Sequence, residues 1–179
     1  MGVPYVPVLG LVGTDLLARR DDMVIAPDPF GGSTQTVVAR AMRPDIAVFH
    51  AHKADRQGNV SCGYAAETVI LAEASAQVIV TAEEIVDRLV EKESVGAFLP
   101  SILVDSVVHA PLGAHPGGLT GRYPVDHDAM RAYVAAAQGD ATFATWLDEH
   151  VFSVADHDAY VARVVPEAIR VAAAGSGKR

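Results

Sequence analysis

The sequence predicts an α/β fold with an open, mainly parallel sheet, helices on both faces and a helical C-terminal region. Residues 45–51 form a near-continuous apolar run, the pattern of a strand that is covered on both faces, and residues 77–81 predict a second buried strand. A third strand is predicted over residues 102–109. Two helical patterns separate them, one over residues 65–76 and one that begins at Thr81 and runs through Val90. Strand, helix, strand, helix, strand is the order of a parallel sheet with helical crossovers.

The segment before these strands is apolar but broken. Residues 3–9 contain Pro4 and Pro7, and a proline removes a donor from a strand ladder. This segment therefore predicts an edge strand or an extended stretch. Residues 10–32 are rich in glycine and proline and predict loops, followed by a short strand at 36–39.

The C-terminal third predicts three helices. Asp126 is placed to cap the first, which Gly139 ends. The second presents Phe143 and Trp146, and Ser153 is placed to cap a third with an apolar stripe that runs to residue 171. We expect one α/β domain over residues 1–171 and a frayed tail over residues 172–179.

Composition excludes several classes of function. There are 22 acidic against 14 basic residues, for a net charge of −8, and a nucleic-acid surface needs clustered Lys and Arg instead. No apolar run reaches the roughly 18–20 residues that a membrane span requires. The single cysteine, Cys62, excludes an internal disulfide and a multi-cysteine metal site. We expect a soluble, cytoplasmic protein with no membrane, nucleic-acid or metal partner.

Polar residues gather where predicted strands end, which is the edge at which open α/β sheets bind ligands. The first loop contains His50 and His52, then a turn with Asp55, Gly58 and Asn59. The turn residues suit a tight reversal with side chains bonded back to the backbone. Two histidines two positions apart on a strand share a face, but without a third ligand they make a weak metal site.

Two further loops are candidates. Gly113, His115 and Pro116 lie in a glycine-rich loop that either is purely structural or presents His115 as an acid or base. Gly13 and Thr14 follow the opening extended segment, where Thr14 or Asp15 either caps a short helix or meets a ligand. We assign no residue of this chain a catalytic role.

Glu83 and Glu84 also follow a predicted strand, where a catalytic carboxylate could lie. The run Thr81-Ala82-Glu83-Glu84 fits a capping box, however, and this structural interpretation of Glu84 is favoured.

These segments together resemble the later part of the α subunit of class I CoA-transferases. The similarity is carried by ordered motifs: residues 2–8 and 10–16, Asp28-Pro29-Phe30, residues 41–45, 54–59, 78–85 and 104–108, and residues 110–116. The Gly-Ala-His-Pro sequence at 113–116 is similar to the glutaconate branch. The glycine-rich segment that precedes these motifs in full α subunits is absent here, so we expect a chain that begins in mid-domain.

The resemblance implies a fold and an activity. Family members move CoA from an acyl-CoA to a carboxylic acid through an acyl-glutamyl anhydride and a glutamyl-CoA thioester. The nucleophilic glutamate belongs to a β subunit, in a Ser-Glu-Asn-Gly-like setting that this chain lacks. The resemblance therefore implies a hetero-oligomer with a β subunit, inactivity of this chain alone, and a CoA thioester as substrate with no further cofactor.

Two other functions stay open. One is hydrolysis of a CoA thioester, or ring opening of a cyclic diketone CoA ester of the steroid-degradation type, which members of this fold without the partner glutamate perform. The other is a non-catalytic α/β module. The sequence does not name the acyl group or the acceptor acid.

Overall fold

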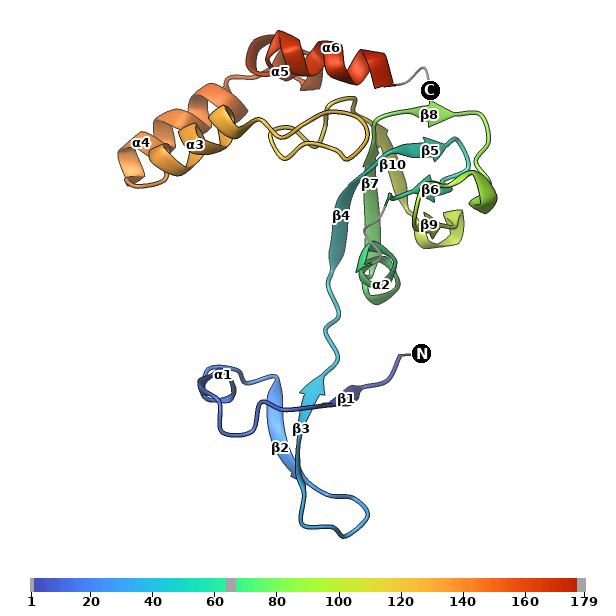
Figure 1. Ribbon diagram of the computed structural model, residues 1–179, viewed down its shortest axis with the longest axis vertical. Helices are drawn as coiled ribbons and strands as arrows, with labels where there is room; N and C mark the ends of the chain where they lie inside the picture. The colour runs from blue at the N-terminus through green and yellow to red at the C-terminus, as the bar shows by residue number, and fades with distance from the viewer. Residues whose placement is uncertain (1, 64–66, 177–179) are drawn as a thin grey trace. The chain divides into compact units, whose positions relative to one another are not determined.

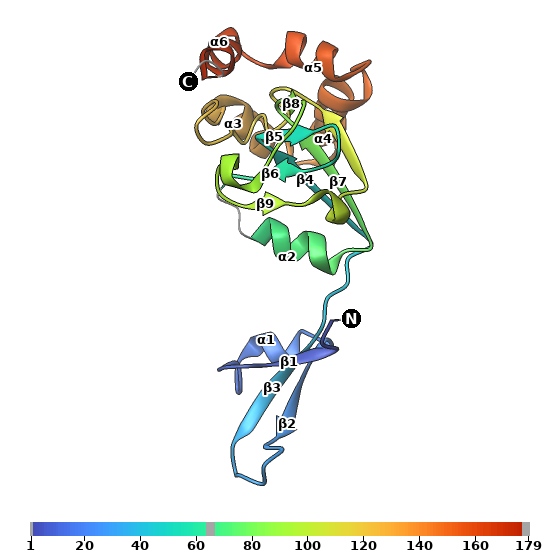
Figure 2. The same ribbon diagram turned by 90° about the vertical axis from the view of Figure 1, so that its right-hand side faces the viewer.

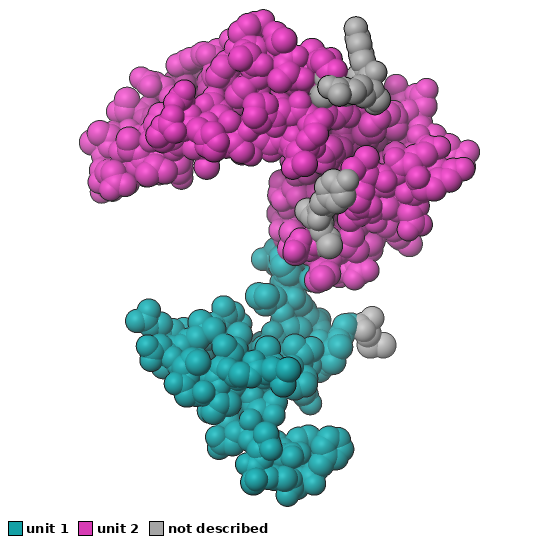
Figure 3. All heavy atoms as spheres, in the orientation of Figure 1, with its two compact units in different colours: residues 1–45, 74–76 teal, residues 46–73, 77–179 magenta. Residues whose placement is uncertain are grey.

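The computed structural model describes residues 2–63 and 67–176 of the chain. The chain divides into two compact units, one of residues 1–45 and 74–76 and the other of residues 46–73 and 77–179 (Figure 3). The sequence shows no linker at these positions, and each unit is described by itself below.

The first unit is a three-stranded antiparallel sheet in the order β1-β3-β2 (Figure 1). Its strands are β1 (Tyr5–Val8), β2 (Met23–Pro27) and β3 (Gln35–Arg40), and a short helix α1 (Asp15–Ala18) precedes β2. Val37 at the centre of β3 pairs with Val8 on one side and with Ile25 on the other, and it is fully buried. The strand predicted at 36–39 is confirmed, whereas β2 lies in a region that the sequence predicts as loop.

The second unit contains the predicted parallel sheet, in the order β10-β7-β4. Its strands are β4 (Ile46–Ala51), β7 (Gln77–Ala82) and β10 (Ser106–His109). Strand β7 lies between the other two and is parallel to both. Its buried residues Val78 and Val80 are part of a core cluster that includes Leu99. The α/β class is therefore confirmed. The expectation that the strands are covered on both faces is wrong for β4 in this chain, because Ile46 and Val48 are 52% and 62% exposed while Ala47 is buried.

A second sheet of this unit has the order β8-β5-β6-β9 and is not predicted by the sequence. Its strands are short: β5 (Lys53–Asp55), β6 (Val60–Ser61), β8 (Ile85–Val86) and β9 (Phe98–Leu99). The helix predicted from Thr81 through Val90 is wrong, because Ile85 pairs in parallel with Ala54 as part of this sheet. Before β10, residues Ser101–Leu103 form a 3-10 turn, so the third predicted strand is shorter than expected.

Helices lie at both ends of the parallel strands (Figures 1 and 2). Helix α2 (Glu67–Ala74) leads into β7, and residues 64–66, which include the predicted start of this helix, lie outside the described residues. The C-terminal region is helical as predicted, with α3 (His127–Ala136), α4 (Asp140–Leu147), α5 (His157–Val164) and α6 (Glu167–Ser176). A π-helical turn, Asp148–Phe152, continues α4.

The caps of these helices follow local sequence rules in part. Asp126 caps α3 by accepting a hydrogen bond from the backbone N–H of Ala129, at 2.9 Å, as predicted. The cap predicted at Ser153 is wrong, because Asp156 caps α5 by accepting from Ala159. The predicted third helix is two helices, since Pro166 has no N–H to continue α5.

Part of the predicted frayed tail, residues 172–179, is helical. Helix α6 continues through residues 172–176, where Ala172, Ala173 and Ala174 favour helix and two of them pack on the protein. The remaining residues of the predicted tail, 177–179, lie outside the described residues. No helix in the described parts of the chain is long and apolar enough to cross a membrane.

Candidate functional site

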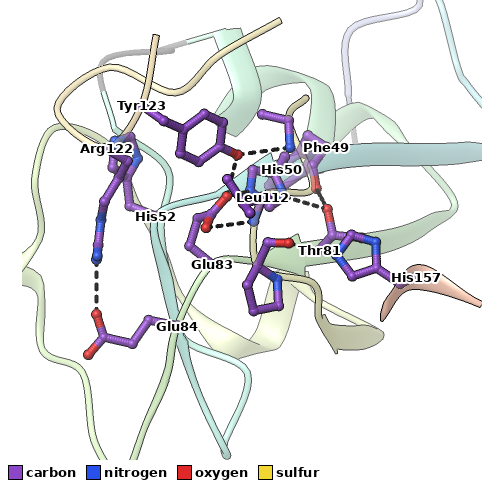
Figure 4. Close-up of polar contacts among 12 residues, drawn as sticks. Phe49, His50, His52, Thr81, Glu83, Glu84, Leu112, Arg122, Tyr123 and His157 are labelled. Atoms are coloured by element: carbon purple, nitrogen blue, oxygen red, sulfur yellow. Dashed lines mark hydrogen bonds and ion pairs between the residues drawn. The ribbon is translucent and has the colours of Figure 1, made fainter. Parts of the chain in front are cut away.

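Glu83 is the centre of a polar cluster at the carboxyl end of the parallel strands (Figure 4). Its Oε1 lies 2.8 Å from Nε2 of His50, and the hydroxyl of Tyr123 donates to the same oxygen. Its Oε2 accepts a hydrogen bond from the backbone N–H of Leu112 at 2.9 Å. One carboxylate therefore joins the ends of strands β4 and β7 to the loop that follows β10.

The cluster extends through hydroxyl groups on both sides. Thr81 lies opposite His50 in the ladder of β4 and β7, and its Oγ1 is 2.8 Å from Nδ1 of the histidine. The Tyr123 hydroxyl accepts a hydrogen bond from the backbone N–H of Ala114 at 3.1 Å. Both ring nitrogens of His50 thus have partners, and its orientation is fixed.

The electrostatics of the cluster favour an ionised carboxylate. Burial by itself raises the pKa of Glu83, but the hydrogen bonds from His50, Tyr123 and the Leu112 N–H outweigh it and hold the pKa below its ordinary value. Burial, reinforced by the neighbouring Glu83, raises the pKa of the Tyr123 phenol. An ionised carboxylate with both oxygens engaged is a poor nucleophile. The geometry therefore indicates that Glu83 holds His50, Tyr123 and the Leu112 backbone in place.

Glu84 has a different setting from Glu83. Its Oε2 accepts from Nη2 of Arg122 at 2.9 Å and lies 3.4 Å from Nζ of Lys53. The bond from Arg122, together with the charge of Lys53, lowers the pKa of Glu84. The interpretation of Glu84 as a helix cap is therefore wrong, because strand β8 begins at the next residue and the partner of Glu84 is an arginine distant in sequence.

The two predicted histidines of the first loop do not converge on one ligand. His50 meets Thr81 and Glu83, whereas Nε2 of His52 lies 2.8 Å from the backbone oxygen of Thr120. Within the described residues, no three His, Cys, Asp or Glu side chains are placed to hold a metal ion.

The turn after these histidines is built around a buried carboxylate. Asp55 is 1% exposed and accepts from the backbone N–H groups of Gln57, Asn59 and Leu89. The Asn59 side chain donates to Asp55, and its oxygen accepts from the N–H of Ser101. Burial raises the pKa of Asp55, yet these hydrogen bonds hold it below its ordinary value.

Gly58 completes that turn. Its φ of +94° is a conformation that favours glycine, and a Cβ atom there would lie 3.4 Å from the Ser101 side chain. The expected turn, in which the Asp55 and Asn59 side chains bond back to the backbone, is present. A shallow cavity of about 490 Å³ lies beside it, and Ser106 and His109 also line this cavity.

The loop after β10 uses its own backbone donors. The N–H groups of Leu112 and Ala114 donate to the side chains of Glu83 and Tyr123. Those of Gly113 and His115 donate to the backbone carbonyls of Ala110 and Leu112. A Cβ at Gly113 would lie 2.8 Å from the His50 ring, so glycine permits this close approach. The loop therefore contributes shape, and these four N–H groups are not free to bind an oxyanion.

His115 packs inside the protein. Its side chain is 1% exposed, with Nδ1 at 2.8 Å from the Tyr160 hydroxyl and Nε2 at 3.1 Å from Asp126. It joins the loop to helix α5 and to the cap of α3, and the next residue, Pro116, accepts from the Asp126 N–H. Of the two interpretations of this loop, the contacts of His115 favour the structural one.

The remaining candidates, Gly13 and Thr14, belong to the first unit. Thr14 is the N-cap residue of α1, but its hydroxyl donates to the Leu11 carbonyl at 2.7 Å and makes no cap bond. Gly13 has a φ of +79° and supplies the turn that precedes the helix.

Tyr123 and Arg122 are site residues that the sequence did not indicate. They lie about 40 positions after the glutamates that they bind, and no local pattern links residues at that separation. The only available signal was the position of Glu83 and Glu84 at the end of a buried strand.

The fold and this edge of the sheet define an open α/β protein with a polar cluster at the carboxyl ends of its parallel strands. A family model described as coenzyme A transferase matches residues 1–110. The chain belongs to the coenzyme A transferase family.

Individual relatives agree with that assignment. The chain is 33% identical to the A subunit of 3-oxoadipate CoA-transferase from Pseudomonas knackmussii, over 91% of this chain and 57% of that one. It is 30% identical to the A subunit of glutaconate CoA-transferase from Acidaminococcus fermentans, over 90% of this chain and 56% of that one. The chain thus spans little more than half the length of these two relatives.

Solved structures show the same fold. The crystal structure of glutaconate coenzyme A-transferase from Acidaminococcus fermentans matches with a TM-score of 0.86 and 28% identity, over 94% of this chain and 58% of that one. A variant of the decarboxylase AibA/AibB matches with a TM-score of 0.66 and 33% identity, over 82% of this chain and 53% of that one.

Proposed function

We propose that this chain is the α-subunit portion of a CoA-transferase, which moves CoA between an acyl-CoA and a carboxylic acid. The observation that carries the proposal is the similarity to the A subunits of two CoA-transferases over 90% or more of the chain. CoA enters and leaves as part of the substrates, so the proposal includes no resident cofactor. A cytoplasmic location stays a prediction from the sequence.

The proposal assigns the nucleophile to a partner β subunit. The two carboxylates at the sheet edge support this assignment, since Glu83 is buried with both oxygens bonded and Glu84 is bound by Arg122 and Lys53. In the proposed reaction a partner carboxylate attacks the thioester carbonyl, and CoA thiolate leaves as the anhydride forms. CoA thiolate then attacks the carbonyl carbon of the anhydride that comes from the partner's carboxylate. This step forms a thioester between CoA and the partner and releases the first acid. The acceptor acid replaces CoA by the reverse steps.

The names of the relatives suggest a class of acid. Glutaconate and 3-oxoadipate are both dicarboxylic acids, and the proteins named for them align with most of this chain. We therefore propose that one of the two acids exchanged carries a second carboxylate.

The test is a CoA-exchange assay on this chain copurified with its β subunit. Glutaryl-CoA and acetate are supplied, and the formation of acetyl-CoA and glutarate is followed by chromatography. Transfer predicts equal amounts of both products and, with acyl-CoA alone, a CoA adduct on the β subunit by mass spectrometry. Either polypeptide on its own should give no exchange. Activity of this chain alone would contradict the assignment of the nucleophile to the partner.

A second candidate is decarboxylation of a CoA-linked acid, and the 33% identity to the decarboxylase AibA/AibB favours it. The same assay separates the alternatives by product. A decarboxylase releases CO₂ and keeps the thioester, whereas a thioester hydrolase gives free CoA and free acid. A non-catalytic module gives none of these.

A further inference from the structure

A cleft of about 390 Å³ lies beside the Glu83 cluster, between the edge of the parallel sheet and helix α6. Its apolar lining comes from Pro111 and Leu112 of the loop after β10 and from Ala173 and Ala174 of α6. Leu112 also packs with Ile169 of α6, so the helix is held against this loop. The volume lies within the range of small-molecule sites.

Two arginines face this cleft from different elements. Arg122 comes from the loop before α3 and has a side chain that is only 15% exposed, and Arg170 comes from α6. Arg170 is one helical turn before Ala173 and Ala174, which places all three on one face of the helix. A guanidinium has five N–H donors and no acceptor, and it binds carboxylates and phosphates in a two-point geometry.

Each of the two guanidinium groups has an acidic partner, but one donor has no acceptor in the described parts of the chain. Arg122 gives one bond, from Nη2 to Glu84, and Arg170 gives one, from Nη2 to Glu167 at 2.6 Å. Nε of Arg170 is buried and lacks any partner among the described residues. A buried donor without an acceptor is unfavourable, and such groups often mark a missing ion or ligand.

Of the two arginines that line the cleft, Arg170 has the partner that is more exposed to water. Glu83 is satisfied by its own cluster, and Glu84 is shared between Arg122 and Lys53. The partner of Arg170, Glu167, has a side chain that is 74% exposed, so water weakens that ion pair. An anion in the cleft would therefore compete with a weak partner at Arg170.

We propose that this cleft is a binding site for a small oxyanion, held by the guanidinium of Arg170 with support from Arg122. A carboxylate of the acid substrate and a phosphate of coenzyme A share this chemistry, and the choice of these two probes rests on the proposed function. The acyl part of the ligand would lie along Pro111, Leu112 and the alanines of α6.

The test is calorimetric titration of the purified chain in low salt with glutarate, with adenosine 3′,5′-bisphosphate and with inorganic phosphate. Glutaramide, which has the size of glutarate without its charge, is the ligand control. Arg170→Gln should weaken the best anion at least tenfold, as expected for a charge-assisted pair. Arg163→Gln removes one charge from the neighbouring helix α5 and should change the affinity less than twofold.

A second variant and a melting curve keep the result interpretable. Arg122→Gln removes the second arginine that lines the cleft and should weaken binding of the same anion. Arg170→Lys should give an intermediate loss, because the charge stays and the planar fork is lost. A thermal melt of each variant confirms folding. Saturation by glutarate identifies the acid substrate as the source, and saturation by the bisphosphate identifies CoA.

Two results would overturn the site. One is the absence of saturation by every anion with the folded wild-type chain. The other is an equal loss in the Arg170 and Arg163 variants, which would indicate a diffuse charge effect. The titration measures anion binding without a partner subunit or acyl-CoA. A negative transferase assay would therefore not change the outcome of the binding test.

Discussion

His50 and Glu83 bind each other across strands β4 and β7, with 2.8 Å between Nε2 and Oε1. Both side chains are largely buried, at 12% and 7% exposed. The pair is the point at which two parallel strands and the loop after the third are held together. Its removal should therefore affect stability before it affects any chemistry.

Glu83→Ala should lower the free energy of unfolding by about 2–4 kcal/mol, because His50, Tyr123 and the Leu112 N–H all lose a buried acceptor. Glu83→Gln keeps one acceptor oxygen and should cost less. Urea unfolding measures both changes. Glu91→Gln, at an exposed position of the 3-10 turn Glu91–Glu93, is the control and should stay within about 0.5 kcal/mol of wild type. A Glu83→Ala variant as stable as this control would contradict the role given to the cluster.

Acid should destabilise the chain in part through Glu83. Its hydrogen bonds hold the folded-state pKa below the ordinary value of 4.5, so its contribution to stability is complete above that pH. The contribution is lost as the pH falls through the folded-state pKa, since the unfolded chain then binds the proton more tightly. Unfolding free energies between pH 7 and pH 3 should fall less steeply for Glu83→Gln than for wild type. Parallel profiles would show that Glu83 is not a source of the acid sensitivity.

His115→Ala should destabilise the chain by about 2–3 kcal/mol, since the Tyr160 hydroxyl and Oδ2 of Asp126 each lose a hydrogen-bond partner. For a chain of this size, that loss corresponds to a melting temperature lower by roughly 5–10 °C. His127→Ala is a matched control, because His127 is exposed at the start of α3. If His115 were instead an exposed acid or base, its replacement would leave the melting temperature near that of the control.

Cys62 should resist thiol reagents in the native protein. The side chain is buried, and burial raises its pKa to about 11, so little thiolate is present at pH 8. Labelling by a chromogenic disulfide reagent should be slow in buffer and fast in 6 M guanidinium, with a native rate that follows unfolding. Fast labelling of the folded chain would mean that Cys62 is accessible.

Sequence patterns predicted correctly the elements that depend on residues close in sequence. The apolar run at 45–51 became β4, and the Asp126 cap formed as predicted, because strand propensity and capping depend on residues close in sequence. The capping-box pattern at Thr81 failed for the opposite reason. Ile85 finds a strand partner in Ala54, 31 positions away, and that pairing outweighs a local helix preference.

The candidate site was predicted in outline and corrected in its roles. His50 and the Asp55 turn lie at strand ends as expected. His115, a candidate acid or base from the sequence, is instead a buried residue that packs inside the protein, and Glu83 is the centre of the polar cluster. The partners Tyr123 and Arg122 were beyond prediction, since only the folded backbone brings them to the glutamates.

The sequence by itself determined the α/β class, the positions of the parallel strands and the membership of the coenzyme A transferase family, because these follow from hydrophobic pattern and from ordered motifs. Tertiary structure alone decided that Glu83 bonds to His50 and Tyr123, and that Arg170 faces a cleft beside them. The reason is physical: the direction and burial of a polar side chain depend on neighbours that are distant in sequence, and these meet only when the sheet edge and the C-terminal helices have packed.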